Sequence, residues 1–166
     1  MLERKKVLAT EEEVFGWLKD EMTIAIGEPA PMGLLRQILR LGLKNLTIIA
    51  SSFSLDLLIA CGCVRKTISY LAAGNGSLAV APSFRLAAES GEIIVWECDE
   101  GILTTGLEAA AKNLPFLPCR SGIGTSLPDL NSDLKIINDP FKNEPLIAVP
   151  ALVPDLAIVH ASSSDA

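Results

Sequence analysis

Short apolar segments with the pattern of buried β-strands alternate along this chain with segments of helical periodicity. Such alternation predicts an α/β domain with a mostly parallel sheet, because parallel strands are joined by crossover helices. The predicted strands are residues 23–26, 46–50, 67–71, 93–97, 146–149 and 156–160, and the predicted helices are residues 11–19, 32–41, 55–60, 83–90 and 103–113. At 166 residues the chain is long enough for one domain with a sizeable core. Residues 126–145 are turn-rich and polar, and we expect them to form a surface excursion.

The carboxyl ends of the predicted strands carry the residues to consider for ligand binding, because open parallel sheets bind ligands there. These residues are Gly27, Glu28, Ser51, Ser52, Gly74, Asn75, Gly76, Asp99, Glu100, Arg120, Ser121, Gly122 and His160. The chain has no Ser-His-Asp spacing and no G-x-S-x-G, H-E-x-x-H or G-x-x-x-x-G-K-[ST] motif. A site at this edge would therefore use a carboxylate, an arginine and backbone amides.

The segment DEGILTTGLEAAAKNLPFLPCRSGIGTSLP, residues 99–128, is the most informative part of the chain. Glu100 stands at the entrance of a predicted helix, where the exposed N–H groups favour an ionised carboxyl that can act as a base or nucleophile. The alternative is that Glu100 only offsets the helix dipole. Arg120 lies beside a glycine turn with Ser121 and Gly122 and is suited to an anion, or else pins the loop. A strand-helix-strand connection predicts that Glu100 and Arg120 are neighbours at one sheet edge.

The other candidates have weaker signals. Asn75, between two glycines, forms either a tight turn or a backbone cradle for a substrate. Ser51 either contacts a substrate or caps the helix that follows. Gly27 begins the turn after the first strand, and Glu28 beside it is either a ligand contact or a solvated charge. His160 is the single histidine, and we assign it no catalytic role.

Composition excludes several classes of protein. The net charge of −6 argues against a nucleic-acid partner, because binding phosphates requires concentrated positive charge. The mean hydropathy is +0.39, yet no apolar run approaches the length of a membrane span, so we expect no membrane association. The four cysteines form no C-x-x-C pair and predict reduced thiols and no metal site. The charged segment MLERKKVLATEEE lacks the apolar core of a secretory signal, which predicts the cytoplasm.

The run DEGxLxxGLxAAAxxLPFLPxRSGIGT resembles the A-type subunit of family I CoA-transferases, in particular the glutaconate CoA-transferase group and the related CoA-thioester ring-opening hydrolases. The likeness extends over nearly the whole chain. Further matching segments are DEMTIAIG at residues 20–27, LKNLTII at residues 43–49, GCVRK at residues 62–66 and PDLAIVHA at residues 154–161.

The resemblance implies a three-layer α/β/α domain, of the type also found in ribose-phosphate isomerases and glucosamine-phosphate deaminases. It implies a hetero-oligomer with a B-type subunit that carries the catalytic glutamate, and it implies an acyl-CoA and a free carboxylic acid as substrates without a tightly bound cofactor. In the hydrolases it resembles, the active-site Glu and Arg map to Glu100 and Arg120. A third interpretation is a ligand-sensing domain that has kept only the fold.

Two departures from the family pattern affect these expectations. Where many relatives have a Gly-Gly turn, this chain has Gly27-Glu28-Pro29-Ala30-Pro31, which adds a charge and two rigid residues to the pocket. The chain also stops at Asp165-Ala166, inside the expected Asp-x-x-Gly-Asn motif. We therefore expect residues 1–166 to be one domain that represents the N-terminal part of such a subunit.

Overall fold

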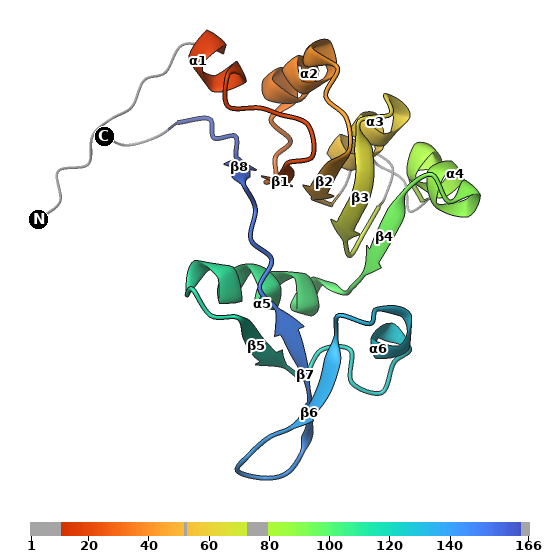
Figure 1. Ribbon diagram of the computed structural model, residues 1–166, viewed down its shortest axis with the longest axis vertical. Helices are drawn as coiled ribbons and strands as arrows, with labels where there is room; N and C mark the ends of the chain where they lie inside the picture. The colour runs from red at the N-terminus through yellow and green to blue at the C-terminus, as the bar shows by residue number, and fades with distance from the viewer. Residues whose placement is uncertain (1–10, 52, 73–79, 164–166) are drawn as a thin grey trace, which may run out of the picture.

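The computed structural model describes residues 11–51, 53–72 and 80–163 (Figure 1). Its helices are α1 (Glu11–Phe15), α2 (Met32–Leu41), α3 (Phe53–Ala60), α4 (Pro82–Ser90), α5 (Glu100–Ala111) and α6 (Leu127–Leu130). Its strands are β1 (Thr23–Ile26), β2 (Leu46–Ile49), β3 (Val64–Ser69), β4 (Ile94–Glu97), β5 (Phe116–Cys119), β6 (Lys135–Asn138), β7 (Pro145–Pro150) and β8 (Leu156–Ile158). The alternation of strands and helices up to α5 agrees with the sequence prediction.

A parallel sheet with the strand order β4-β3-β2-β1-β8 forms the centre of the molecule. Ile24 of β1 pairs with Ile48 of β2 on one side and with Leu156 of β8 on the other. Side chains alternate between the two faces of each strand. Ile24 and Ile48 therefore point to one face and their neighbours Ala25 and Ile49 to the other. The predicted α/β architecture with a mostly parallel sheet is confirmed.

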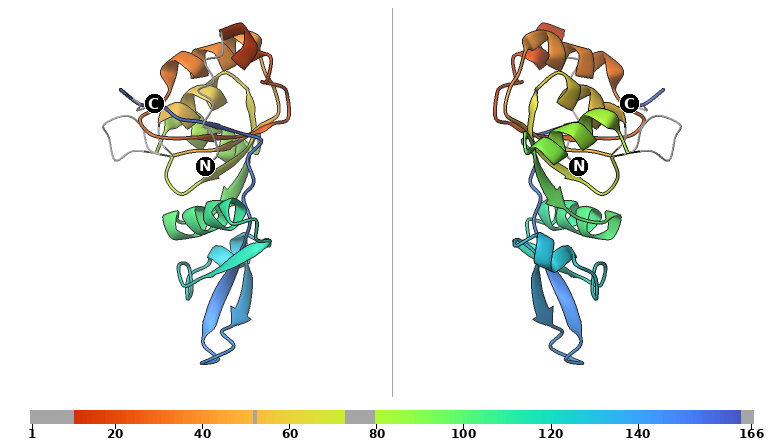
Figure 2. Two further views of the ribbon diagram at one scale, coloured as in Figure 1. Left: turned by 90° about the vertical axis from the view of Figure 1, so that its left-hand side faces the viewer. Right: turned by 90° about the vertical axis from the view of Figure 1, so that its right-hand side faces the viewer.

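The two faces of this sheet are covered by different elements (Figure 2). Helices α1 to α4 lie on one face, which we call the α2–α4 face, and they enclose a core that includes Ile24, Leu35, Ile48 and Leu58. Helix α5 lies on the other face, which we call the α5 face, and it is backed by a second sheet. Ile49, Ile68, Trp96, Ile102, Ile147 and Val149 form the core on this side. Helices on both faces of a sheet make the three layers that the resemblance implied.

The second sheet is antiparallel, with the strand order β5-β7-β6, and it differs from the prediction for this region. The segment 146–149 was expected to join the parallel sheet, and this was wrong. Strands β6 and β7 are joined by a short turn, which forces them to run antiparallel. Only alternate residues of β7, Ile147 and Val149, are fully buried, because one face of the strand packs toward α5. The predicted surface excursion contains α6 and β6.

Asp56 of α3 secures the start of α4. Residue Ala81, at the N-cap of α4, offers no side-chain acceptor, and the buried carboxylate of Asp56 accepts the N–H of Phe84 at 2.8 Å instead. The hydroxyl of Ser83 also donates to Asp56 at 3.3 Å. A residue on one helix thus supplies the N-terminal cap of the next helix and holds the two together.

We expect Asp56→Ala to lower the free energy of unfolding by about 1–2 kcal/mol, because the N–H of Phe84 loses its acceptor. Asp56→Asn is the matched control, since its amide oxygen can accept the same bond at nearly the same volume. Equilibrium denaturation by urea measures both variants. Equal stability of Asp56→Ala and the parent chain would contradict the capping role.

Candidate functional site

The entrance of α5 is built around the carboxylate of Asp99. One oxygen of Asp99 accepts the N–H of Ile102 at 2.7 Å, which caps the helix, and the other accepts the hydroxyl of Ser121 at 2.6 Å. Gly101 is required here, because a Cβ at this position would lie 2.7 Å from Cβ and Oγ of Ser121. The turn after β5 is therefore locked against the first turn of α5. Sequence reasoning placed these two segments together and missed the bond between Asp99 and Ser121.

Glu100 is the first residue of α5, and its side chain is exposed. Its carboxylate makes no hydrogen bond or ion pair with the residues that the structure describes. The carboxylate at this helix end is consequently accessible to a ligand or to a neighbouring chain.

Arg120 and Glu100 form no ion pair, although the residues next to them, Ser121 and Asp99, are hydrogen-bonded. The guanidinium of Arg120 instead forms an ion pair with Glu144, the residue before β7, and the side chain of Arg120 is 70% exposed. The Glu144 carboxylate raises the pKa of Arg120 above its usual value, which keeps the guanidinium charged. The prediction that the two segments meet agrees with the bond between Ser121 and Asp99, while the ionic partner of Arg120 is Glu144. The turn after β5 thus lies beside the entrance of α5, although β5 itself belongs to the antiparallel sheet.

Gly27 and Ser51, which follow β1 and β2, line one cavity on the α5 face, with a volume of about 220 Å³. Its walls are mainly apolar, and it is also lined by Ala25, Ile26, Ile49, Ala50, Tyr70, Leu103, Leu107, Ala157 and Val159. We call it the α5 groove. Gly27 permits a close approach of strands there, since a Cβ on Gly27 would lie 3.1 Å from Cγ1 of Val159. Tyr70 follows β3 by one residue, so the rule that identified Gly27 and Ser51 could also have identified it.

The remaining predicted site residues that the structure describes are not among the residues that line the α5 groove. Gly122 has a φ of +79°, and it packs against Ile102 and Ile147 as part of the core. Ser121 bonds to Asp99, as described above. Asn75 lies outside the described residues. His160 is exposed beyond β8.

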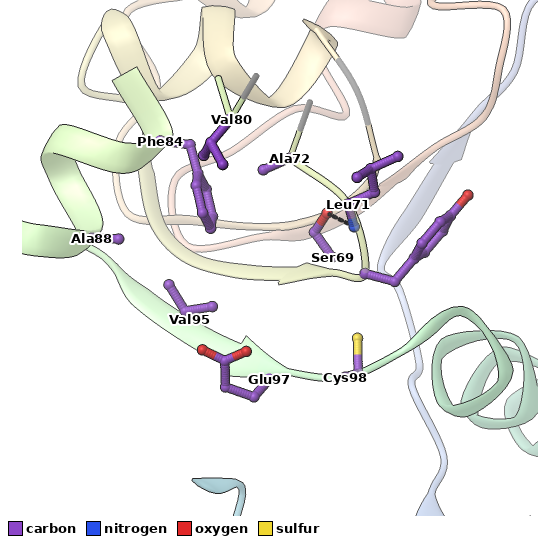
Figure 3. Close-up of a pocket in the computed structure, with 10 residues that line it drawn as sticks. Ser69, Leu71, Ala72, Val80, Phe84, Ala88, Val95, Glu97 and Cys98 are labelled. Atoms are coloured by element: carbon purple, nitrogen blue, oxygen red, sulfur yellow. Dashed lines mark hydrogen bonds between the residues drawn. The ribbon is translucent and has the colours of Figure 1, made fainter. Parts of the chain in front are cut away.

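A second cavity, of about 350 Å³, lies between the ends of β3 and β4 and helix α4 (Figure 3). Phe84 and Val80 form one wall, and Val95 and Cys98 form the opposite wall. Burial, together with the nearby charge of Asp99, raises the pKa of the Cys98 thiol to about 12. The thiol is therefore protonated at neutral pH and is unsuited to nucleophilic attack.

The described residues contain no group of three or more His, Cys, Asp or Glu side chains that could hold a metal ion. No helix among the described residues is long and apolar enough to cross a bilayer. Among the described residues that line the α5 groove, Ser51 and Tyr70 carry the hydroxyl groups.

Comparison with known proteins identifies this arrangement. The family model described as coenzyme A transferase matches residues 9–166. The chain belongs to this family. The resemblance found in the sequence is therefore confirmed, together with its three-layer fold.

Several members of the coenzyme A transferase family and related proteins are similar to the chain. It is 38% identical over 165 residues to the cholesterol ring-cleaving hydrolase IpdA subunit of Rhodococcus jostii, with 93% of this chain and 56% of that protein covered. It is 33% identical over 168 residues to the A-type subunit of 3-oxoadipate CoA-transferase from Pseudomonas knackmussii, with 96% and 59% covered. Glutaconate coenzyme A-transferase from Acidaminococcus fermentans matches in structure with a TM-score of 0.84 at 28% identity, over 94% of this chain and 56% of that one. The chain spans somewhat more than half the length of these relatives.

Proposed function

We propose that this chain acts as the A-type subunit of a two-subunit CoA-transferase, which moves CoA between an acyl-CoA and a free carboxylic acid. Two relatives are named as the A-type subunits of such enzymes. The observation that supports the proposal most is the lining of the α5 groove, where the described residues offer apolar walls and no carboxylate. The groove suits an acyl or pantetheine chain, and the nucleophile must come from elsewhere.

In the proposed reaction, a glutamate that belongs to the B-type partner attacks the thioester carbonyl and expels the CoA thiolate, which leaves an acyl-glutamyl anhydride. The thiolate then attacks the glutamyl carbonyl and releases the free acid, and the glutamyl-CoA thioester that remains passes CoA to the second acid by the reverse steps. The A-type chain contributes the apolar groove and the close backbone approach at Gly27. Ser51 lines the groove, and in this proposal its hydroxyl donates to the thioester oxygen as that oxygen becomes negative.

The alternative is a subunit of a CoA-thioester ring-opening hydrolase. The 38% identity to a ring-cleaving hydrolase subunit favours it, and so does the accessible carboxylate of Glu100 at the entrance of α5. In that reaction Glu100 would act as base or nucleophile, and Arg120 would bind an anionic group of the substrate after leaving Glu144.

Substitution of Glu100 by Gln distinguishes the two functions. We expect the reconstituted complex that carries Glu100→Gln to keep CoA-transfer activity within about tenfold of the parent, because the nucleophile belongs to the partner. Glu108→Gln, on the exposed side of the same helix, is the matched control for the loss of one charge. The assay follows exchange of CoA between an acyl-CoA and a dicarboxylate. A loss of more than about a hundredfold in Glu100→Gln alone would favour the hydrolase.

A further inference from the structure

A cleft of about 560 Å³ opens on the α5 face between the parallel and the antiparallel sheet. Lys66 and Ile68 of β3 and Trp96 of β4 line one side of it. Asp133 and Lys135, before and in β6, line the other side. The cleft shares no lining residue with the α5 groove, so it is a separate site from the one assigned to the transferase reaction.

Hydrogen bonds between the two sheets hold the walls of this cleft in place. The indole N–H of Trp96 donates to the carboxylate of Asp133 at 2.9 Å. The side-chain amide of the buried Asn131 donates to the carbonyl of Glu97 at 2.8 Å, and its oxygen accepts the N–H of Asp133 at 3.1 Å. These bonds join the loop before β6 to β4. The two walls of the cleft are therefore held in position before any ligand binds.

The charges in the cleft are unbalanced. Lys66 is half-buried and Lys135 is exposed, and neither ammonium group has an ion pair or hydrogen bond with residues 11–51, 53–72 and 80–163. Asp133 is the single carboxylate in the lining, and it already accepts the Trp96 N–H. Two lysines and one aspartate leave the cleft with an excess positive charge, in a chain whose net charge is −6.

We propose that this cleft binds a small organic oxyanion, a carboxylate or a phosphate, between Lys66 and Lys135. Lys66 and Lys135 both line this cleft, and neither has an ionic partner among the described residues, so they provide the charge for such a ligand. Ile68 and Leu152 supply an apolar wall for the rest of the molecule. The site does not depend on the proposed transferase function, since its residues lie outside the α5 groove.

Calorimetric titration of the chain with inorganic phosphate, at an ionic strength held constant with sodium chloride, tests the proposal. We expect saturable binding with one site per chain, and about tenfold weaker binding for Lys66→Met and for Lys135→Met. Lys142→Met removes the same charge from an exposed turn outside the cleft and should bind like the parent. Lys66→Arg keeps the charge and should retain most of the affinity.

Three results would overturn the proposal. The first is the absence of saturable binding to the parent chain, and the second is an equal loss of affinity in Lys142→Met. The third is unchanged binding in both Lys66→Met and Lys135→Met, when circular dichroism shows that the variants are folded. The comparison with Lys142→Met separates binding in the cleft from a general effect of net charge on phosphate.

Discussion

Purified without its B-type partner, the chain is expected to exchange CoA between an acyl-CoA and a free dicarboxylate at least about 10⁴-fold more slowly than the reconstituted complex. The physical reason is that the α5 groove contains no carboxylate among the described residues, and Cys98 is held as a neutral thiol. Without a nucleophile, the two covalent steps of the exchange cannot begin. Release of the acid product, followed by chromatography, measures both rates.

The matched control is the same complex with the proposed B-type glutamate replaced by glutamine, which should be as inactive as the isolated chain. Turnover of the isolated chain within about tenfold of the complex would contradict the assignment of the nucleophile to the partner. Activity of the isolated chain that disappears in Glu100→Gln would place the nucleophile at the entrance of α5 instead.

Substitution of Gly106 by Val is expected to lower the free energy of unfolding by about 3 kcal/mol. Gly106 is buried in α5 against the segment after β7, and a Cβ there would lie 2.7 Å from Cγ of Leu152 and 3.1 Å from the carbonyl oxygen of Pro150. The N–H of Leu152 also donates to the carbonyl of Gly106 at 2.9 Å, so the two segments cannot separate without loss of this bond. Urea denaturation measures the change.

Gly33→Ala is the control for this prediction. Gly33 lies in α2, where a Cβ would meet no atom within 4 Å, so alanine should stabilise the chain by about 0.5–1 kcal/mol through its higher helix propensity. Opposite signs for the two substitutions would show that close packing, and not helix propensity, explains the glycine at position 106. Equal stability of Gly106→Val and the parent chain would contradict the close approach of Leu152.

Periodicity and turn residues in the sequence were sufficient to predict the parallel half of the fold. The strand β1 and the helix α2 were predicted with their observed bounds, because a short apolar strand and an amphipathic helix are defined by local spacing. The motif at residues 99–125 was sufficient to recognise the family. The same end-of-strand rule placed Gly27 and Ser51 at the lining of one cavity.

Only the tertiary structure decided the sheet to which β5, β6 and β7 belong. An apolar strand pattern predicts which residues are buried, but it does not predict which strand lies beside them. For this reason the segment 146–149 was assigned to the wrong sheet. The partners of charged side chains depend on the same choice. Arg120 meets Glu144 at the ends of the paired strands β5 and β7, and Trp96 of β4 meets Asp133 in the loop before β6. Local sequence contains no signal for such pairs, because which side chains meet depends on how segments distant in the chain are brought together.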